Sequence, residues 1–275
     1  MIGVFDSGVG GLTIVKEIFK YLPEYQIIYF GDTARLPYGT KGADFVQRYS
    51  AKIVNWLLKK KAKLIVVACH TSSAWASDFL KEKFSAPKGR DLAEGENKMP
   101  IFEMITPGAS EAANSTKSRK VGIIGTSGTI KSGSWEKKLL ELNPGLKIYS
   151  KPCPLFVSLV EEGWINKGVT KKIAEEYLEP FKEKKIDTLV LACTHYPLLK
   201  KIIGEVVGTN IKIINPAESL AKELKLFLKD NLQIASQIKK GKNHQFFFSD
   251  QPYNLEKISH LCFDRQIKPI IKDPF

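Results

Sequence analysis

Two short segments of the chain nearly repeat each other. Residues 64–71 read Leu-Ile-Val-Val-Ala-Cys-His-Thr, and residues 189–195 read Leu-Val-Leu-Ala-Cys-Thr-His. Each is an apolar run of strand length that ends in a cysteine and small polar groups. The repeat therefore predicts two related α/β units, each with one cysteine, Cys69 or Cys193, at the carboxyl end of a strand.

A second pair of similar segments precedes the cysteines. Residues 3–14 contain Asp6, Ser7 and several glycines, and residues 122–133 contain Thr126, Thr129 and further glycines. Neither segment has the spacing of a nucleotide-binding loop. Both predict a buried strand, a glycine and hydroxyl turn, and a helix, whose N-terminal N–H groups can bind a carboxylate. Two such loops suit an acidic amino acid, which has two carboxylates.

The position of the two cysteines indicates the kind of chemistry. Ligands bind at the carboxyl ends of the strands in open α/β sheets, so two facing units would place Cys69 and Cys193 around one pocket. Acid/base groups on opposite faces of one atom are what racemisation requires. Strand-end cysteines usually serve packing, but the duplicated context favours catalysis here. For Cys153 and Cys262, which have apolar neighbours in the sequence, we expect packing.

Composition and charge restrict the partners. The formal net charge is +13, but only five of the basic residues are arginine, and the lysines are scattered. Arginine is the side chain suited to bidentate phosphate recognition, so we expect no dedicated nucleic-acid site. No apolar run approaches the roughly 20 residues of a membrane span, and we expect no membrane partner. Met1 leads directly into a predicted strand, without a signal peptide, so we expect a cytoplasmic protein.

The sequence predicts neither a metal nor a cofactor. The Cys and His residues lack the spacings of structural zinc sites, and in a reducing compartment the four cysteines are expected to be free thiols. No lysine has a recognisable pyridoxal-phosphate context.

Apolar strand patterns and helical patterns alternate along the chain. Strands are predicted near residues 2–5, 26–30, 63–69, 100–104, 120–125, 146–150, 187–193, 211–214 and 245–249, with helices between them. This order predicts two similar doubly wound parallel-sheet domains, related by pseudo-symmetry, with the site in the cleft between them. We expect residues 1–95 plus 208–275 to form the first domain and residues 96–207 the second. The polar segment 85–99 is predicted to be a loop and hinge.

Motifs dispersed over almost the whole chain resemble those of the glutamate racemases, in the same order. They lie at residues 5–12, 31–33, 37–41, 68–69 with Thr71, 106–109, 153–157, 159–161 and 192–199. The resemblance implies a cofactor-independent enzyme, commonly a homodimer, that interconverts L- and D-glutamate for bacterial cell-wall (peptidoglycan) synthesis. It also implies two α/β domains, one of them built from both ends of the chain.

The resemblance also implies a role for individual residues. Cys69 would remove the α-proton of D-glutamate and Cys193 that of L-glutamate, with the other thiol donating on the opposite face. Three residues would assist the thiols: Asp6, His195 and Glu161. The expected substrate-binding residues are Asp6, Ser7, Tyr38, Gly39, His70, Thr71, Thr126, Thr129, Thr194 and His195.

Position 70 departs from the family pattern, which has Asn after the first cysteine where this chain has His70. Neutral histidine can still donate one hydrogen bond to a substrate carboxylate. Two alternatives stay open: a racemase of aspartate or another acidic amino acid, and a binding protein that uses the same cleft without turnover. The histidine after Cys193-Thr194 favours glutamate, since aspartate racemases tend to have Glu there.

Overall fold

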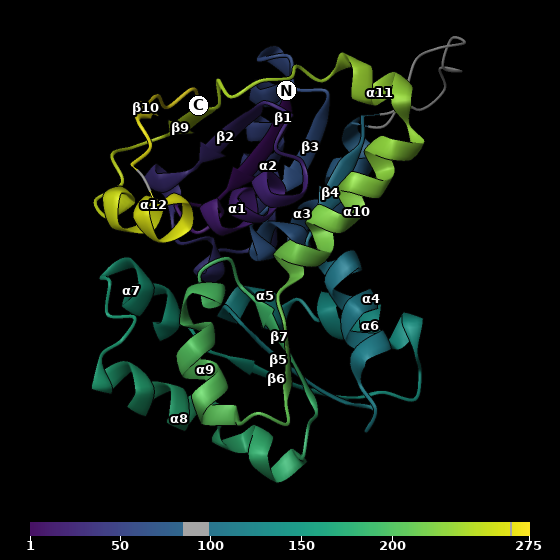
Figure 1. Cartoon of the computed structure of the whole chain (residues 1–275), viewed down its shortest axis with the longest axis vertical. Coiled ribbons are helices and arrows are strands. Elements are labelled where there is room, and N and C mark those ends of the chain that lie inside the picture. The colour runs from purple at the N-terminus through teal and green to yellow at the C-terminus, as the bar shows by residue number, and fades with distance from the viewer. Residues whose placement is uncertain (85–98, 265) are drawn as a thin grey trace.

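The computed structural model describes residues 1–84, 99–264 and 266–275, and it contains two parallel sheets (Figure 1). The first has six strands, in the order β10 (Pro269–Ile271), β9 (Gln245–Phe248), β2 (Ile27–Gly31), β1 (Ile2–Asp6), β3 (Leu64–Val67) and β4 (Ile101–Glu103). The second has four strands, in the order β6 (Lys147–Pro152), β5 (Lys120–Gly125), β7 (Thr188–Ala192) and β8 (Lys212–Ile214). The prediction of two parallel α/β sheets is confirmed.

Helices connect the strands and cover the sheets. Those that follow strands of the first sheet, or return to it, are α1 (Leu12–Tyr21), α2 (Ala43–Lys59), α3 (His70–Phe84), α10 (Pro216–Asp230), α11 (Leu232–Gln237) and α12 (Leu255–Phe263), with short 3-10 turns η1 (Thr33–Arg35) and η2 (Tyr38–Thr40). The second sheet is accompanied by α4 (Ile105–Ser115), α5 (Ser127–Lys131), α6 (Ser134–Leu142), α7 (Leu155–Glu161), α8 (Gly168–Lys184), η3 (Tyr196–Leu199) and α9 (Lys200–Val207).

Alternation along the strands places helices on both faces of the first sheet. Ile2 and Val4 of β1 belong to the core cluster that contains α1 and α10, whereas Phe5 belongs to the cluster that contains α2 and α3. Side chains alternate between the faces of a strand, so a strand covered on both sides is apolar throughout. The first of these clusters continues into α7, α8 and α9, so one hydrophobic core joins the two halves of the molecule, each half being one sheet with its helices.

Sheet membership differs from the predicted domain limits at two strands. Strand β4 pairs with β3 in the first sheet, although residues 101–103 were assigned to the second domain. Strand β8 pairs with β7 in the second sheet, although residues 212–214 were assigned to the first domain. The predicted boundary at residue 95 and most of the predicted hinge lie outside the described residues. The division into domains itself stays a prediction.

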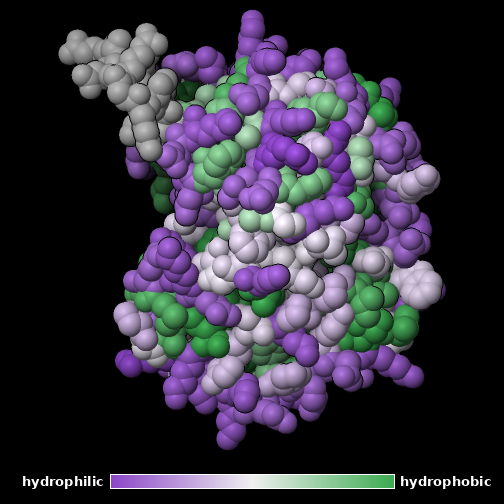
Figure 2. All heavy atoms as spheres, turned by 180° about the vertical axis from the view of Figure 1, so that it is seen from behind, coloured by the Kyte–Doolittle hydropathy of each residue, from purple (hydrophilic) through white to green (hydrophobic). Residues whose placement is uncertain are grey.

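The surface shows hydrophobic side chains scattered among hydrophilic ones, and the outline narrows at one side between the two halves (Figure 2). Within the described ranges, no helix is long and apolar enough to cross a membrane.

Candidate active site

The register of the two sheets brings the predicted residues to one place. In the first sheet, Phe5 pairs with Val67, so Asp6, the last residue of β1, and Cys69, two residues after β3, lie at neighbouring strand ends. In the second sheet, Gly125 pairs with Ala192, so Thr126 and Cys193 each come directly after a strand. A cavity of about 30 Å³ is lined by Ser7, Pro37, Tyr38, Gly39, Cys69, His70, Thr71, Thr126, Val157, Cys193, Thr194 and His195. Both cysteines therefore face one pocket between the two halves.

Cys193 is linked to a histidine and a carboxylate. Its Sγ lies 3.8 Å from His195 Nδ1, and His195 Nε2 lies 3.0 Å from Glu161 Oε1. Burial by itself lowers the pKa of His195, but the hydrogen bonds to Cys193 and Glu161, together with their charges, raise it to about 10. His195 is thus held as a cation at neutral pH, beside the Cys193 sulfur.

Cys69 has a different environment, without a histidine partner. Its thiol donates to Ser7 Oγ at 3.7 Å, and its sulfur accepts from the backbone N–H of Ser72 at 3.5 Å. Burial, and next the charge of Asp6, raise the pKa of Cys69 to about 11. Cys69 therefore holds its proton more firmly than an exposed thiol does.

Asp6 lies beneath this thiol and is fully buried. Its Oδ2 accepts from the backbone N–H of Gly8 at 3.0 Å, and its Oδ1 has no partner among the described residues. Burial raises the pKa of Asp6, although the charge of His195 and three backbone N–H groups oppose the shift. The Cys69 thiol donates to Ser7 Oγ, and the assisting role of Asp6 stays a prediction.

Three threonine hydroxyls meet on the other side of the pocket. Thr71 Oγ1 lies 3.0 Å from Thr126 Oγ1 and 3.1 Å from Thr129 Oγ1, and the last two lie 2.9 Å apart. Thr71 comes from the first turn of α3 and the other two from the start of α5, so the cluster joins the two halves. Hydroxyl groups can both donate and accept, and they can turn from one another to a carboxylate.

His70 begins α3 and is almost fully buried. Its ring stacks on that of Trp135, with 5.8 Å between the centroids, and its Nδ1 has no partner among the described residues. Burial lowers the pKa of His70 to about 3. His70 is therefore neutral, and it can offer a substrate a hydrogen bond but no charge.

Gly10 allows the two loops to meet. A Cβ at position 10 would lie 2.3 Å from Thr194 Oγ1 and 2.6 Å from His195 Nδ1. The backbone here is also fixed, because Thr13 Oγ1 donates to the carbonyl of Gly10 at 2.9 Å and to that of Thr194 at 2.8 Å. The loop that follows β1 therefore packs directly on the loop that follows β7.

We expect Gly10→Ala to lower the free energy of unfolding by about 1–3 kcal/mol, because the added methyl group must displace Thr194 or His195. Urea unfolding followed by circular dichroism measures this change. Gly42→Ala is the matched control, since a Cβ there meets nothing within 4 Å. Equal stability of the two variants would contradict the close packing at Gly10.

Most of the predicted site residues line the pocket, and three lie behind it. The pocket lining does not include Asp6, Thr129 or Glu161. Each adjoins a residue that does line the pocket: Asp6 precedes Ser7 in the sequence, Thr129 Oγ1 contacts Thr71 Oγ1, and Glu161 Oε1 contacts His195 Nε2. Pro37 and Val157 also line the pocket, although the sequence predicted no role for either. The only signal for them was their place in the motifs that resemble those of the glutamate racemases. Among the residues that the structure describes, no three His, Cys, Asp or Glu side chains gather to hold a metal ion.

The fold agrees with the comparisons to known proteins. The family model Asp/Glu/Hydantoin racemase matches residues 2–224, and the chain belongs to this family. Its relatives include curated glutamate racemases. That of Geobacter metallireducens is 44% identical over 94% of this chain and 91% of its own length. That of Aquifex aeolicus is 40% identical over 98% of this chain and 96% of its own length. The crystal structure of glutamate racemase from Francisella tularensis in complex with D-glutamate superposes with a TM-score of 0.85 at 36% identity, covering 98% of this chain and 96% of that chain.

Proposed function

We propose that the chain is a glutamate racemase that interconverts L- and D-glutamate with two thiols and no cofactor. The observation that carries the proposal is the pocket that Cys69 and Cys193 share, one from each sheet. The glutamate racemases named above support the substrate, since they match nearly the whole chain.

In the proposed reaction, the thiolate of Cys193 takes the α-proton of L-glutamate and becomes a thiol. The electron pair of the broken C–H bond stays on the α-carbon and its carboxylate. Cys69 then gives its proton to the opposite face, which produces D-glutamate and leaves a Cys69 thiolate. The reverse reaction exchanges the two roles, and each direction is general acid–base catalysis by a positioned pair.

The surroundings of the thiols match this cycle. His195 stabilises the Cys193 thiolate, whereas the raised pKa of Cys69 keeps that thiol protonated and ready to donate. The α-proton is weakly acidic, so the developing charge on the carboxylate needs stabilisation. The hydroxyls of Thr71 and Thr126 and the N-terminus of α3 are placed to provide it.

Substrate access requires a change of the cavity. At about 30 Å³ the cavity holds a water molecule or two, not an amino acid. We propose that the two halves separate to admit glutamate and close again around it, which excludes water from the reacting carbon.

Glu161→Gln provides a test through pH. The pKa of His195 is raised, so its cationic form, and the stability that this form contributes, are present below the ordinary histidine pKa and are lost as pH rises through about 10. We expect racemase activity to fall over the same alkaline range. In Glu161→Gln the pKa of His195 should drop, so the alkaline fall of kcat should begin at lower pH. An unchanged pH profile would contradict the role of Glu161.

The physiological part of the proposal is a cytoplasmic homodimer that supplies D-glutamate for peptidoglycan. The resemblance to the family supports it. Growth of a D-glutamate-requiring bacterial strain that expresses this chain would test the supply of D-glutamate. Light scattering of the purified protein would test the homodimer.

Polarimetry with each enantiomer of glutamate and aspartate tests the activity itself, without pyridoxal phosphate and with EDTA present. We expect loss of optical rotation with both enantiomers of glutamate. Faster turnover of aspartate would favour the related aspartate activity, and binding without turnover would favour a binding protein. Activity that a chelator abolishes and zinc restores would contradict the cofactor-independent mechanism.

A further inference from the structure

The loop between β2 and α2 carries three residues of the pocket, Pro37, Tyr38 and Gly39. It also touches the other half of the molecule, since a Cβ on Gly39 would lie 2.7 Å from Thr126 Cβ. The pocket is therefore closed only while this loop keeps its position against Thr126.

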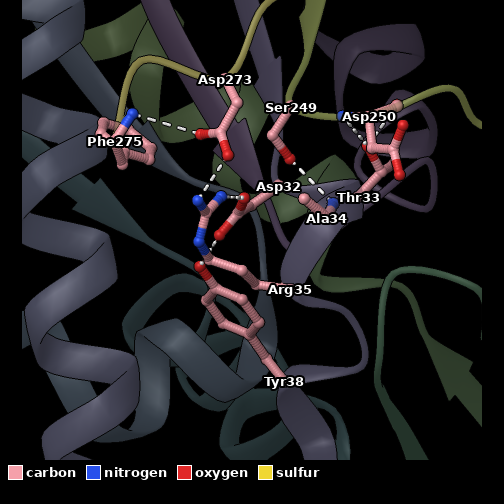
Figure 3. A network of polar contacts seen from close by, with 9 residues as sticks. All are labelled: Asp32, Thr33, Ala34, Arg35, Tyr38, Ser249, Asp250, Asp273 and Phe275. Carbon is pink, nitrogen blue, oxygen red and sulfur yellow. Dashed lines mark hydrogen bonds and ion pairs between the residues drawn. The ribbon is translucent and has the colours of Figure 1, made fainter.

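A series of hydrogen bonds and ion pairs connects this loop to Asp273, which is far along the sequence (Figure 3). The hydroxyl of Tyr38 donates to Asp32 Oδ2 at 2.6 Å, and Arg35 Nη1 donates to Asp32 Oδ1 at 2.7 Å. Arg35 Nη2 then donates to Asp273 Oδ2 at 2.6 Å. Asp32 is fully buried, and each of its two carboxylate oxygens accepts a hydrogen bond from one of these donors.

Aromatic rings and backbone contacts support the same connection. The guanidinium of Arg35 lies over the rings of Tyr49 and Phe275, at 4.8 and 5.5 Å from their centroids. The other flank of the loop is fixed as well: Ala34 N–H donates to Ser249 Oγ at 2.8 Å, and Asp250 N–H donates to Thr33 Oγ1 at 2.9 Å.

We infer that Arg35 and Asp273 are positioning residues for the substrate loop: through Asp32 they hold Tyr38, and with it Gly39, in the closed pocket. The inference rests on the proposed function. Neither residue is among those that line the pocket, so we expect their effect to pass through Asp32 and Tyr38.

The test is Asp273→Asn, assayed as a racemase alone and combined with Tyr38→Phe. The loop binds substrate but carries no thiol, so we expect KM for glutamate to rise about five- to tenfold, with kcat changed less than about twofold. Because both residues act through Asp32, Asp273→Asn should add little to the KM of Tyr38→Phe. The matched control is Glu179→Gln, which breaks the exposed Glu179–Lys182 ion pair on α8 and should leave KM unchanged.

A purely structural role would lower stability and leave KM as it is. A KM for Asp273→Asn within about twofold of the wild type, or independent effects of Asp273→Asn and Tyr38→Phe, would overturn the inference. Amide hydrogen exchange of residues 33–41 gives a reading that needs no activity, and it should be faster in Asp273→Asn than in the wild type. Unchanged exchange would overturn the positioning role, whereas a wild-type protein that fails to racemise glutamate would overturn the proposed function only.

Discussion

Cys69→Ser and Cys193→Ser should each reduce racemisation by at least about 10³-fold, because serine keeps the shape of the side chain but is a far weaker acid. Both sulfurs face the same pocket, and in the proposed cycle each acts in both directions. The measurement is polarimetry of the purified variants, together with thermal unfolding to show that they fold.

The two remaining cysteines provide the control for this pair. Cys153 and Cys262 are also free and buried, but both lie in the hydrophobic core and neither lines the pocket. Cys153→Ser and Cys262→Ser should cost stability and leave kcat close to that of the wild type. Full activity of either Cys69→Ser or Cys193→Ser would contradict the two-thiol mechanism.

Position 70 should respond to hydrogen-bonding capacity rather than to charge. His70 lines the pocket and is neutral, with its pKa lowered to about 3, so its contribution to binding is that of a donor. We expect His70→Asn to retain or improve turnover of glutamate. His70→Leu should lose about 1–3 kcal/mol of binding, since a carboxylate oxygen would be left unpaired. Steady-state KM and kcat for the three proteins measure this ranking.

The packing of Trp135 on His70 requires a second control. Unfolding free energies of both variants show whether the ring stack, rather than the substrate, suffers. If His70→Asn is as inactive as His70→Leu while both fold normally, then the ring performs a step that an amide cannot, and the assignment of glutamate as the substrate would have to be revised.

The central strands of both sheets could be predicted from the sequence because β1, β2, β3, β5 and β7 are nearly continuous runs of buried residues. Residues 2–5 and 120–125, for example, are strands in the structure. Strand β10 has three residues and begins with Pro269, and α5 has five residues, so neither contains enough of a period to be recognised. Helices α11 and α12 were not predicted either: α11 has six residues and is separated from the end of α10 by one residue, and α12 lies beyond the last predicted strand.

The site divides in the same way. The repeated strand ends predicted the two thiols, since parallel strands end at one edge of their sheet. The partners of those thiols depend on tertiary contacts: Glu161 reaches His195 from the end of α7, and the Cys69 thiol donates to Ser7 in the loop after β1. The contact of Arg35 with Asp273 joins residues 238 positions apart, so no local sequence pattern predicts it.

Proton NMR of glutamate during turnover in D2O tests the two-thiol account most directly. Starting from L-glutamate, each inversion should place solvent deuterium at the α-carbon of D-glutamate, because the proton that the product receives comes from Cys69 and not from the substrate. The L-glutamate that remains early in the reaction should keep its α-hydrogen. Deuterium that enters L-glutamate as fast as it enters D-glutamate would show that one base serves both faces, and it would contradict the account.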